Sequence, residues 1–240
     1  MTNNISRSMH GIPFEQKNHV RVGFVGVGWR GQDLINEMLF CDGVEVAAIA
    51  DLRADMLDMT AAHLAEKGRQ RLAVFHGTDS WQRMLEMDLD LVVIATTWET
   101  HTPIAVAAME AGKHVALEVP AAVTFEQCWQ LVETSERTRR HCVILENCCY
   151  GYWEMMAKRM AFAGLFGILT HAECAYIHDL RYMYFYQDDH EQWRRKAHMQ
   201  TNGNHYPTHG LGPVAKCLKI GDGDAFDYLV SMSSREAALT

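Results

Sequence analysis

The chain has 240 residues, of which 48% are hydrophobic and 22% charged, as in average globular domains. The 30 acidic residues outnumber the 22 Lys and Arg, giving a formal net charge of -8, which disfavours a nucleic-acid partner because phosphate binding needs clustered positive charge. No apolar run approaches the roughly 18 residues of a membrane helix, so we expect no membrane partner. Seven cysteines without paired zinc-site spacing predict free thiols in a reducing, cytoplasmic compartment.

The first part of the chain predicts an α/β fold. Residues 1–19 are polar, and we expect a flexible N-terminal arm. From residue 20 to residue 148, short apolar runs alternate with amphipathic stretches, which is typical of βαβ units. Strands are predicted at Val20–Val25, Val44–Ala50, Leu72–Phe75, Leu89–Ala95, His114–Leu117 and Val143–Leu145, and helices at Trp29–Phe40, Arg53–Lys67, Trp81–Met87, Pro103–Ala111 and Phe125–Arg139. This pattern indicates a Rossmann domain with a doubly wound parallel sheet.

The second part, residues 149–240, predicts an α+β domain. A Met-rich helix is expected over residues 150–163, strands at Ile168–Ile177 and Phe226–Met232, and a short helix at His209–Leu218. Because two strands do not complete a sheet, we expect a mostly antiparallel sheet that is incomplete at the C-terminus. An open sheet edge favours pairing with another subunit, so a homo-oligomer is expected.

A glycine-rich turn, Gly26-Val-Gly28-Trp-Arg-Gly31, follows the first strand and opens a helix. Glycines there allow a tight turn and a close backbone approach to a pyrophosphate, which binds at the helix N-terminus. Asp51 ends the next strand about 20 residues later, where a carboxylate accepts hydrogen bonds from the ribose and repels a 2′-phosphate. The spacing therefore predicts NAD. Arg53 is an argument for NADP, because its side chain could reach a 2′-phosphate.

The fourth strand leads into Trp98, Glu99, Thr100 and His101. The carboxyl end of a parallel sheet is where ligands of such folds bind. We therefore interpret these four residues as neighbours of the cofactor. The alternatives are a surface aromatic residue for Trp98 and a helix cap for His101.

Two motifs carry a family resemblance. The segment Gly112-Lys-His-Val-Ala-Leu-Glu118-Val119-Pro120 resembles the GKHVxxEKP segment of the glucose-fructose oxidoreductase and inositol dehydrogenase superfamily. Val119 stands where those dehydrogenases carry a proton-transferring lysine. With Glu146-Asn147, Tyr176 to Arg181, Trp193-Arg194 and the segment from Asn202 to Pro213, the chain is similar to glycoside hydrolase family 109, the NAD-dependent α-N-acetylgalactosaminidases. His205 departs from the leucine that is commoner in that family.

The resemblance implies two sets of site residues. Together with the glycine turn, the NAD contacts would be Gly26, Gly28, Trp29, Arg30, Gly31, Asp51, Trp98, Glu99, Thr100, His101, Glu118, Val119, Asn147, Trp193 and Arg194. The substrate contacts would be Tyr176, Arg194, Tyr206, Pro207, Thr208 and His209. The substrate implied is a small glycoside.

The resemblance also implies a redox cycle, in which NAD takes hydride from C3 of the sugar and later returns it. Proton transfer near neutral pH suits histidine or tyrosine. We assign the C3 hydroxyl proton to His209, and C2 or the leaving oxygen to Tyr176 or Tyr206. His205 and His209 are four residues apart, but Pro207 between them disfavours a regular helix and hence a metal pair, so we expect no metal.

Three functions follow as hypotheses. The leading one is an NAD-dependent glycosidase that hydrolyses α-linked N-acetylgalactosamine by oxidation, elimination, addition and reduction. The second is a conventional NAD-dependent sugar or polyol dehydrogenase, against which Val119 argues because an apolar side chain cannot transfer protons. The third is a non-catalytic protein that binds NAD or a sugar.

Overall fold

The computed structural model describes residues 8–69, 71–185, 192–201 and 203–235. The chain divides into two compact units, Met1–Leu145 and Glu146–Thr240, and each is considered by itself. The expected domain boundary after residue 148 falls inside the short helical turn η1 (Asn147–Cys149). Across the described ranges, no helix has both the length and the apolar character to cross a membrane.

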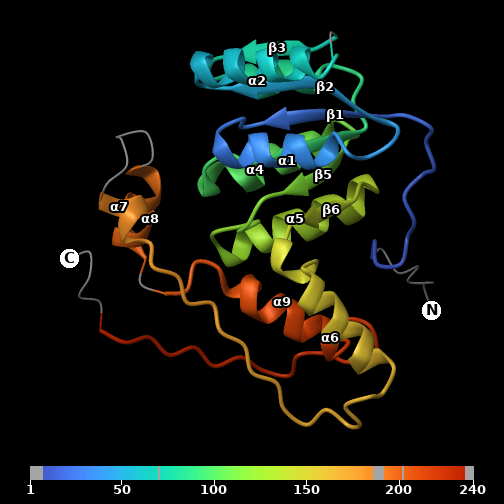
Figure 1. Ribbon diagram of the computed structural model, residues 1–240, viewed down its shortest axis with the longest axis vertical. Coiled ribbons are helices and arrows are strands. Elements are labelled where there is room, and N and C mark those ends of the chain that lie inside the picture. The colour runs from blue at the N-terminus through green and yellow to red at the C-terminus, as the bar shows by residue number, and fades with distance from the viewer. Residues whose placement is uncertain (1–7, 70, 186–191, 202, 236–240) are drawn as a thin grey trace. The chain divides into compact units, whose positions relative to one another are not determined.

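The first unit contains the predicted parallel sheet (Figure 1). Its strands are β1 (Val20–Val25), β2 (Val44–Asp51), β3 (Ala73–His76), β4 (Leu91–Ile94), β5 (His114–Leu117) and β6 (Cys142–Ile144). All neighbouring pairs are parallel, and the spatial order is β3-β2-β1-β4-β5-β6. This order reverses direction between β1 and β4, which makes their carboxyl ends the switch point where dinucleotides bind.

Five helices connect these strands: α1 (Trp29–Met38), α2 (Ala54–Glu66), α3 (Ser80–Leu85), α4 (Trp98–Glu110) and α5 (Phe125–Thr138). The predicted start of α4 was wrong. Because proline is favoured at the first helical position, Pro103 marked the expected start, whereas the helix begins at Trp98. Inside the helix, Pro103 cannot donate a backbone hydrogen bond, which is a cost to stability. Burial of Trp98 and Ile104 offsets this cost and stabilises the extra turn.

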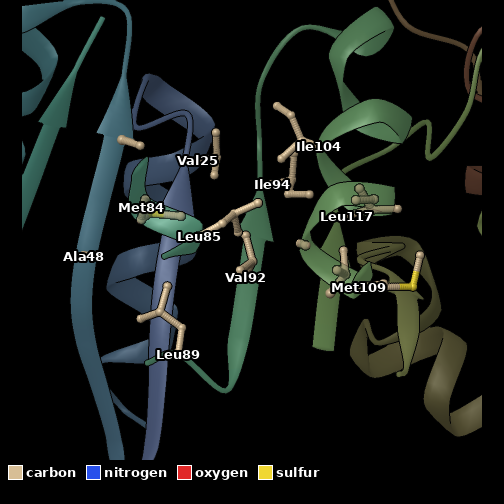
Figure 2. Close-up of a cluster of buried hydrophobic side chains, with 14 of the residues drawn as sticks. Val25, Ala48, Met84, Leu85, Leu89, Val92, Ile94, Ile104, Met109 and Leu117 are labelled. Atoms are coloured by element: carbon tan, nitrogen blue, oxygen red, sulfur yellow. The ribbon is translucent and has the colours of Figure 1, made fainter. Parts of the chain in front are cut away.

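Both faces of this sheet are buried, which explains why the strands are almost continuously apolar. One face packs Val25, Val92 and Ile94 against Ile104, Met109 and Leu117 (Figure 2). The other packs Phe24, Ile49 and Val93 against Ile35, Leu57 and Leu64 of α1 and α2. Burial of each such side chain contributes about 1.5–3 kcal/mol, so the strand ends that carry the site are held on a rigid layer.

Part of the expected N-terminal arm is anchored to the first unit. Lys17 Nζ lies 2.5 Å from the Asp90 carboxylate. The Phe14 ring lies 3.9 Å from the His141 ring, measured between centroids. Within residues 8–19, these two side chains therefore contact the rest of the first unit.

The second unit contains η1, α6 (Tyr152–Phe162), α7 (Arg181–Phe185), α8 (Gln192–Gln200) and α9 (Pro207–Cys217). The strands predicted at Ile168–Ile177 and Phe226–Met232 were wrong, since both segments are irregular. Between residue 146 and residue 235, the β structure of the described parts is limited to one isolated bridge, between Ile220 and Asp224. A strand requires a hydrogen-bonding neighbour as well as an apolar pattern, so the antiparallel sheet is not confirmed.

Candidate active site

The glycine turn of the first unit leaves room for a ligand. Gly26 has a φ of 85°, and a Cβ there would lie 2.6 Å from the Ala95 carbonyl oxygen at the end of β4. A Cβ on Gly31 would overlap the Gly26 carbonyl group. A Cβ on Gly28, by contrast, would meet no atom within 4 Å. Two glycines are therefore required by the turn itself, whereas Gly28 borders open space at the N-terminus of α1, where a pyrophosphate fits.

Asp51 connects the end of β2 to this turn. Its Oδ2 atom accepts a hydrogen bond from the Val27 N–H at 2.7 Å, and Oδ1 accepts one from the Arg53 N–H at 2.8 Å. The Arg53 guanidinium group lies against the Asp55 carboxylate, at 2.5 Å from Nη2 to Oδ2. The carboxylate thus lies beside the glycine turn while the arginine is engaged by an acid, an arrangement that favours NAD over NADP.

Two further predicted cofactor residues are joined by an ion pair. Arg30 Nε in the first turn of α1 lies 2.7 Å from Glu118 Oε1, beyond the end of β5. The other oxygen of Glu118 accepts a hydrogen bond from the Val119 N–H at 3.0 Å. Val119 itself is buried and has no ionisable group, so it performs no proton transfer.

The segment that follows β4 divides into buried and exposed residues. Trp98 and His101 are 3% and 1% exposed, whereas Glu99 and Thr100 are exposed. The two ring nitrogens of His101 face the carbonyl oxygens of Pro120 and Thr96, at 2.8 and 3.1 Å. Burial lowers the pKa of His101, opposed by these hydrogen bonds. A cofactor contact from Trp98 or His101 would therefore use the backbone, and one from Thr100 the hydroxyl group.

The second unit brings the three predicted catalytic residues together. The ring of His209 lies 4.6 Å from that of Tyr176, edge to face, and is stacked on that of Tyr206 at 5.2 Å. The centroids of the two tyrosine rings are 6.2 Å apart. Tyr176 comes from an irregular segment, and the other two come from the start of α9. The imidazole therefore lies beside both phenol rings.

A buried carboxylate orients this histidine. His209 Nδ1 lies 2.6 Å from Oε1 of Glu146, and the two side chains are only 11% and 5% exposed. The same oxygen accepts a hydrogen bond from the Cys148 N–H at 3.1 Å. Because the carboxylate accepts, the proton of a neutral His209 is assigned to Nδ1, and Nε2 keeps the lone pair that a general base needs. Glu146 is thus a positioning residue for His209.

Two glycines explain how α9 comes this close. A Cβ on Gly212 would lie 2.8 Å from Cys149 Sγ and 3.3 Å from Glu146 Cγ. A Cβ on Gly210 would lie 3.0 Å from Cys174 Sγ. Glycine inside a helix costs about 0.5–1 kcal/mol relative to alanine. Here it lets α9 pack directly against η1 and the segment around Cys174.

The remaining predicted residues surround this cluster in part. Arg194 of α8 donates a hydrogen bond to the Tyr206 hydroxyl group, and its guanidinium group lies 4.8 Å from the centre of the Trp193 ring. Asn147 and Pro207 are exposed, and Thr208 is half-buried. Arg194 and Tyr206 thus form a polar pair beside His209, with the chemistry to bind sugar hydroxyl groups.

Family profiles match both parts of the chain. The profile of the oxidoreductase family with the NAD-binding Rossmann fold matches residues 20–145. The chain belongs to this family. The profile of the glycosyl hydrolase 109 C-terminal domain matches residues 150–240, so the resemblance to glycoside hydrolase family 109 is confirmed. NAD is the cofactor of the first unit.

Individual relatives agree with these profiles. The chain is 49% identical to a glycosyl hydrolase family 109 protein of Solibacter usitatus, over 98% of this chain and 54% of the relative. It is 48% identical to an α-N-acetylgalactosaminidase of Bacteroides fragilis, over 92% of this chain and 53% of that protein. The chain therefore spans about half the length of these relatives.

Solved structures share the fold. An NAD-binding protein from Listeria innocua gives a TM-score of 0.52 at 26% identity, covering 63% of this chain and 42% of that one. A scyllo-inositol dehydrogenase from Lactobacillus casei gives a TM-score of 0.55 at 19% identity, covering 65% of this chain and 45% of that one. These two likenesses show a shared fold.

Sequence reasoning assigned no role to two residues close to His209. Glu146 is 63 residues away from His209, and its signals were the resemblance at Glu146-Asn147 and an acid directly after the last strand. Cys148 gave no signal as a neighbour of the histidine. His205, which the sequence placed four residues from His209, has its Nε2 atom 3.1 Å from the Thr201 carbonyl oxygen and its ring tilted against that of His198, with 3.8 Å between the centroids.

Proposed function

We propose that this chain acts as an NAD-dependent glycosidase on α-linked N-acetylgalactosamine. The observation that carries the proposal is the hydrogen bond between His209 and the buried Glu146, with two tyrosine rings beside the imidazole. The other unit of the chain is an NAD-binding domain. The 48% identity to an α-N-acetylgalactosaminidase supports the choice of sugar. Small glycosides are thus the proposed substrates.

The proposed reaction leaves no net redox change. Bound NAD supplies the acceptor for hydride from C3 and the donor that returns it. Loss of the hydride from C3 and the proton from O3 gives a ketone, which acidifies the proton on C2. Removal of that proton breaks the C1–O bond, and the aglycone leaves with a proton. Water then adds hydroxyl at C1 and a proton at C2, and the ketone is reduced.

His209 is the proposed base for the O3 proton, because its Nδ1 is bonded to Glu146 and Nε2 carries the lone pair. Tyr176 is proposed to act at the leaving oxygen. Burial and the neighbouring Cys148 raise the pKa of Tyr176, so the phenol stays protonated near neutral pH and has a proton to give. Tyr206 is the alternative at C2, and Arg194 with Tyr206 is proposed to bind the sugar.

The proposed NAD contacts follow the site of the first unit. The glycine turn would bind the pyrophosphate, and Asp51 would accept hydrogen bonds from the ribose. The exposed Glu99 and Thr100, together with Arg30 and Glu118, lie on segments at the carboxyl ends of β1, β4 and β5. From the second unit, the proposal adds Asn147, Trp193 and Arg194 on the family resemblance alone.

An assay of glycoside cleavage and coenzyme state tests the proposal. The purified chain is loaded with NAD and incubated with p-nitrophenyl N-acetyl-α-galactosaminide. Nitrophenol release without accumulation of reduced coenzyme is expected. Reduced coenzyme formed in proportion to substrate would support a sugar or polyol dehydrogenase instead. Binding of NAD with no cleavage would support the non-catalytic alternative.

We further propose a reducing, cytoplasmic setting for this chain. All seven cysteines are free thiols in the structure, and the net charge of -8 is unfavourable for nucleic acid.

The mostly antiparallel sheet of the second domain is retained as a proposal that depends on a partner strand. Support comes from exposed apolar residues in the two irregular segments, where Ile177 and Met232 are 93% and 91% exposed. Light scattering of the purified chain tests the homo-oligomer that such pairing would produce.

A further inference from the structure

Three potential metal ligands meet in the second unit. Glu146, Cys148 and His209 each place one donor atom within 4.8 Å of the other two. Glu146 and Cys148 lie at the start of η1, and His209 lies in the first turn of α9. The close packing that Gly212 permits between α9 and η1 brings these ligands together from positions far apart in the sequence.

We propose that Glu146, Cys148 and His209 form a binding site for a single thiophilic divalent cation, with zinc as the natural choice. A carboxylate oxygen, a thiolate and an imidazole nitrogen are all zinc ligands, and three of them with one open position make a tetrahedral site. Magnesium and calcium are disfavoured, because they prefer oxygen ligands alone. Such a site is distinct from the pairing of His205 with His209 considered from the sequence.

A second observation points to a cation at this position. Glu146 is 4% exposed, and its Oε2 atom is buried without a hydrogen-bond partner among the described residues. Oε1, by contrast, already accepts from the Cys148 N–H and faces His209 Nδ1. An unsatisfied buried acceptor on a charged group is unfavourable by more than about 1–3 kcal/mol. A cation bound by both oxygens of this carboxylate would give Oε2 a partner and remove that penalty.

The arrangement needs only small movements to bind the ion. His209 Nδ1 and Glu146 Oε1 are 2.6 Å apart, a hydrogen-bond distance. Two ligands bonded to one zinc ion at about 2.0–2.1 Å in tetrahedral geometry lie roughly 3.3 Å from each other. The pair must therefore open by less than about 1 Å, and the Cys148 thiol must approach. The ion would take the place of the proton between Nδ1 and Oε1, and metal binding generally releases such protons.

Occupation of the site has a consequence for the proposed glycosidase. A cation on Nδ1 of His209 would replace the hydrogen bond to Glu146. The carboxylate would then bind the ion and would no longer orient the base. We therefore expect added zinc to lower turnover. This second readout rests on the proposed function, whereas binding of the ion itself does not.

Cobalt titration tests the binding directly. The chain is reduced, freed of metal with a chelator and titrated with Co²⁺, which gives a thiolate-to-cobalt absorption band when a cysteine is a ligand. One cobalt per chain with this band, displaced by zinc, is expected. Loss of a residue that hydrogen-bonds to a metal ligand lowers metal affinity roughly 10–100-fold, and loss of a ligand itself should lower it at least as much. Cys148→Ser, Glu146→Gln and His209→Gln should each show that loss.

Matched variants separate this site from other thiols and histidines. Cys41→Ser changes an exposed cysteine of the first unit, and His205→Gln changes the nearby histidine that is not in the cluster. Both should bind cobalt like the parent chain, and circular dichroism checks that every variant is folded. Absence of the band in the parent chain, or its persistence in Cys148→Ser, would overturn the proposal whether or not the chain cleaves glycosides.

Discussion

Replacing Gly28 by alanine should block NAD without harming the fold. The backbone of Gly28 has φ and ψ of -64° and -168°, a conformation that alanine adopts without strain. The new methyl group would meet no protein atom within 4 Å. At the N-cap position the change costs a few tenths of a kcal/mol to about 1 kcal/mol, and the lower entropy of the unfolded alanine chain returns about 0.4–1 kcal/mol. Stability should therefore change by less than about 1 kcal/mol.

NAD binding should change far more. The methyl group fills the space over the N-terminus of α1 in which the diphosphate is expected. Loss of one charge-assisted hydrogen bond to the phosphate costs about 1.5–3 kcal/mol, which corresponds to a Kd roughly 10–150-fold higher. Isothermal titration calorimetry measures this Kd, and thermal unfolding measures stability. An unchanged Kd in a folded Gly28→Ala variant would refute the placement of the pyrophosphate.

A matched control uses the N-cap of another helix. Gly151 caps α6 with φ and ψ of -62° and 156°, close to the backbone of Gly28. A Cβ there would meet only the end of the flexible Glu154 side chain, which can move. Gly151→Ala should thus reproduce the small effect on stability and leave the affinity for NAD unchanged.

Three further predictions concern catalysis, packing and pH. Glu146→Gln should lower kcat by roughly 10–150-fold through loss of about 1.5–3 kcal/mol of charge-assisted hydrogen bonding, with NAD affinity unchanged in calorimetry; parental turnover would contradict the positioning role. Gly212→Ala should destabilise the chain by about 1–3 kcal/mol through overpacking, measured by urea unfolding. The double variant with Cys149→Ala should recover stability, and no recovery would rule out the clash with Cys149 Sγ. Burial, and then the neighbouring His141, lower the pKa of His114, whose Nδ1 accepts the His141 N–H at 3.0 Å. The unfolded chain, with a pKa of about 6.5, then binds more protons, so stability should fall as the pH drops below about 6.5. The melting temperature should therefore drop less between pH 6.5 and lower pH in His114→Asn than in the parent chain. An equal drop in both proteins would contradict the role of His114.

The fold of the first unit could be predicted from sequence because its signals are local. Alternation of buried strands with helical periodicity identifies each βαβ unit, and the turn from Gly26 to Gly31 marks the switch point. The start of α4 could not be predicted this way. Burial of Trp98, a tertiary effect, outweighs the preference of Pro103 for the first helical position.

The second unit was harder to predict, for two different reasons. The apolar segments Ile168–Ile177 and Phe226–Met232 have the composition of strands, but composition does not supply a pairing partner. The grouping of Tyr176, Tyr206 and His209 was found through family resemblance, and their mutual distances come only from the structure. The bond from Glu146 to the histidine depends on close helix packing, which no local pattern encodes.

The most direct test of the redox cycle follows two hydrogen atoms of the substrate. The NAD-loaded chain is given N-acetylgalactosaminide labelled with deuterium at C3, in ordinary water, and the same unlabelled substrate in deuterium oxide. Mass spectrometry and NMR locate the label in the released sugar. We predict that the C3 deuterium is retained and that C2 acquires deuterium from the solvent. Cleavage with no exchange at C2 would contradict the elimination and addition steps, and with them the proposed role of NAD.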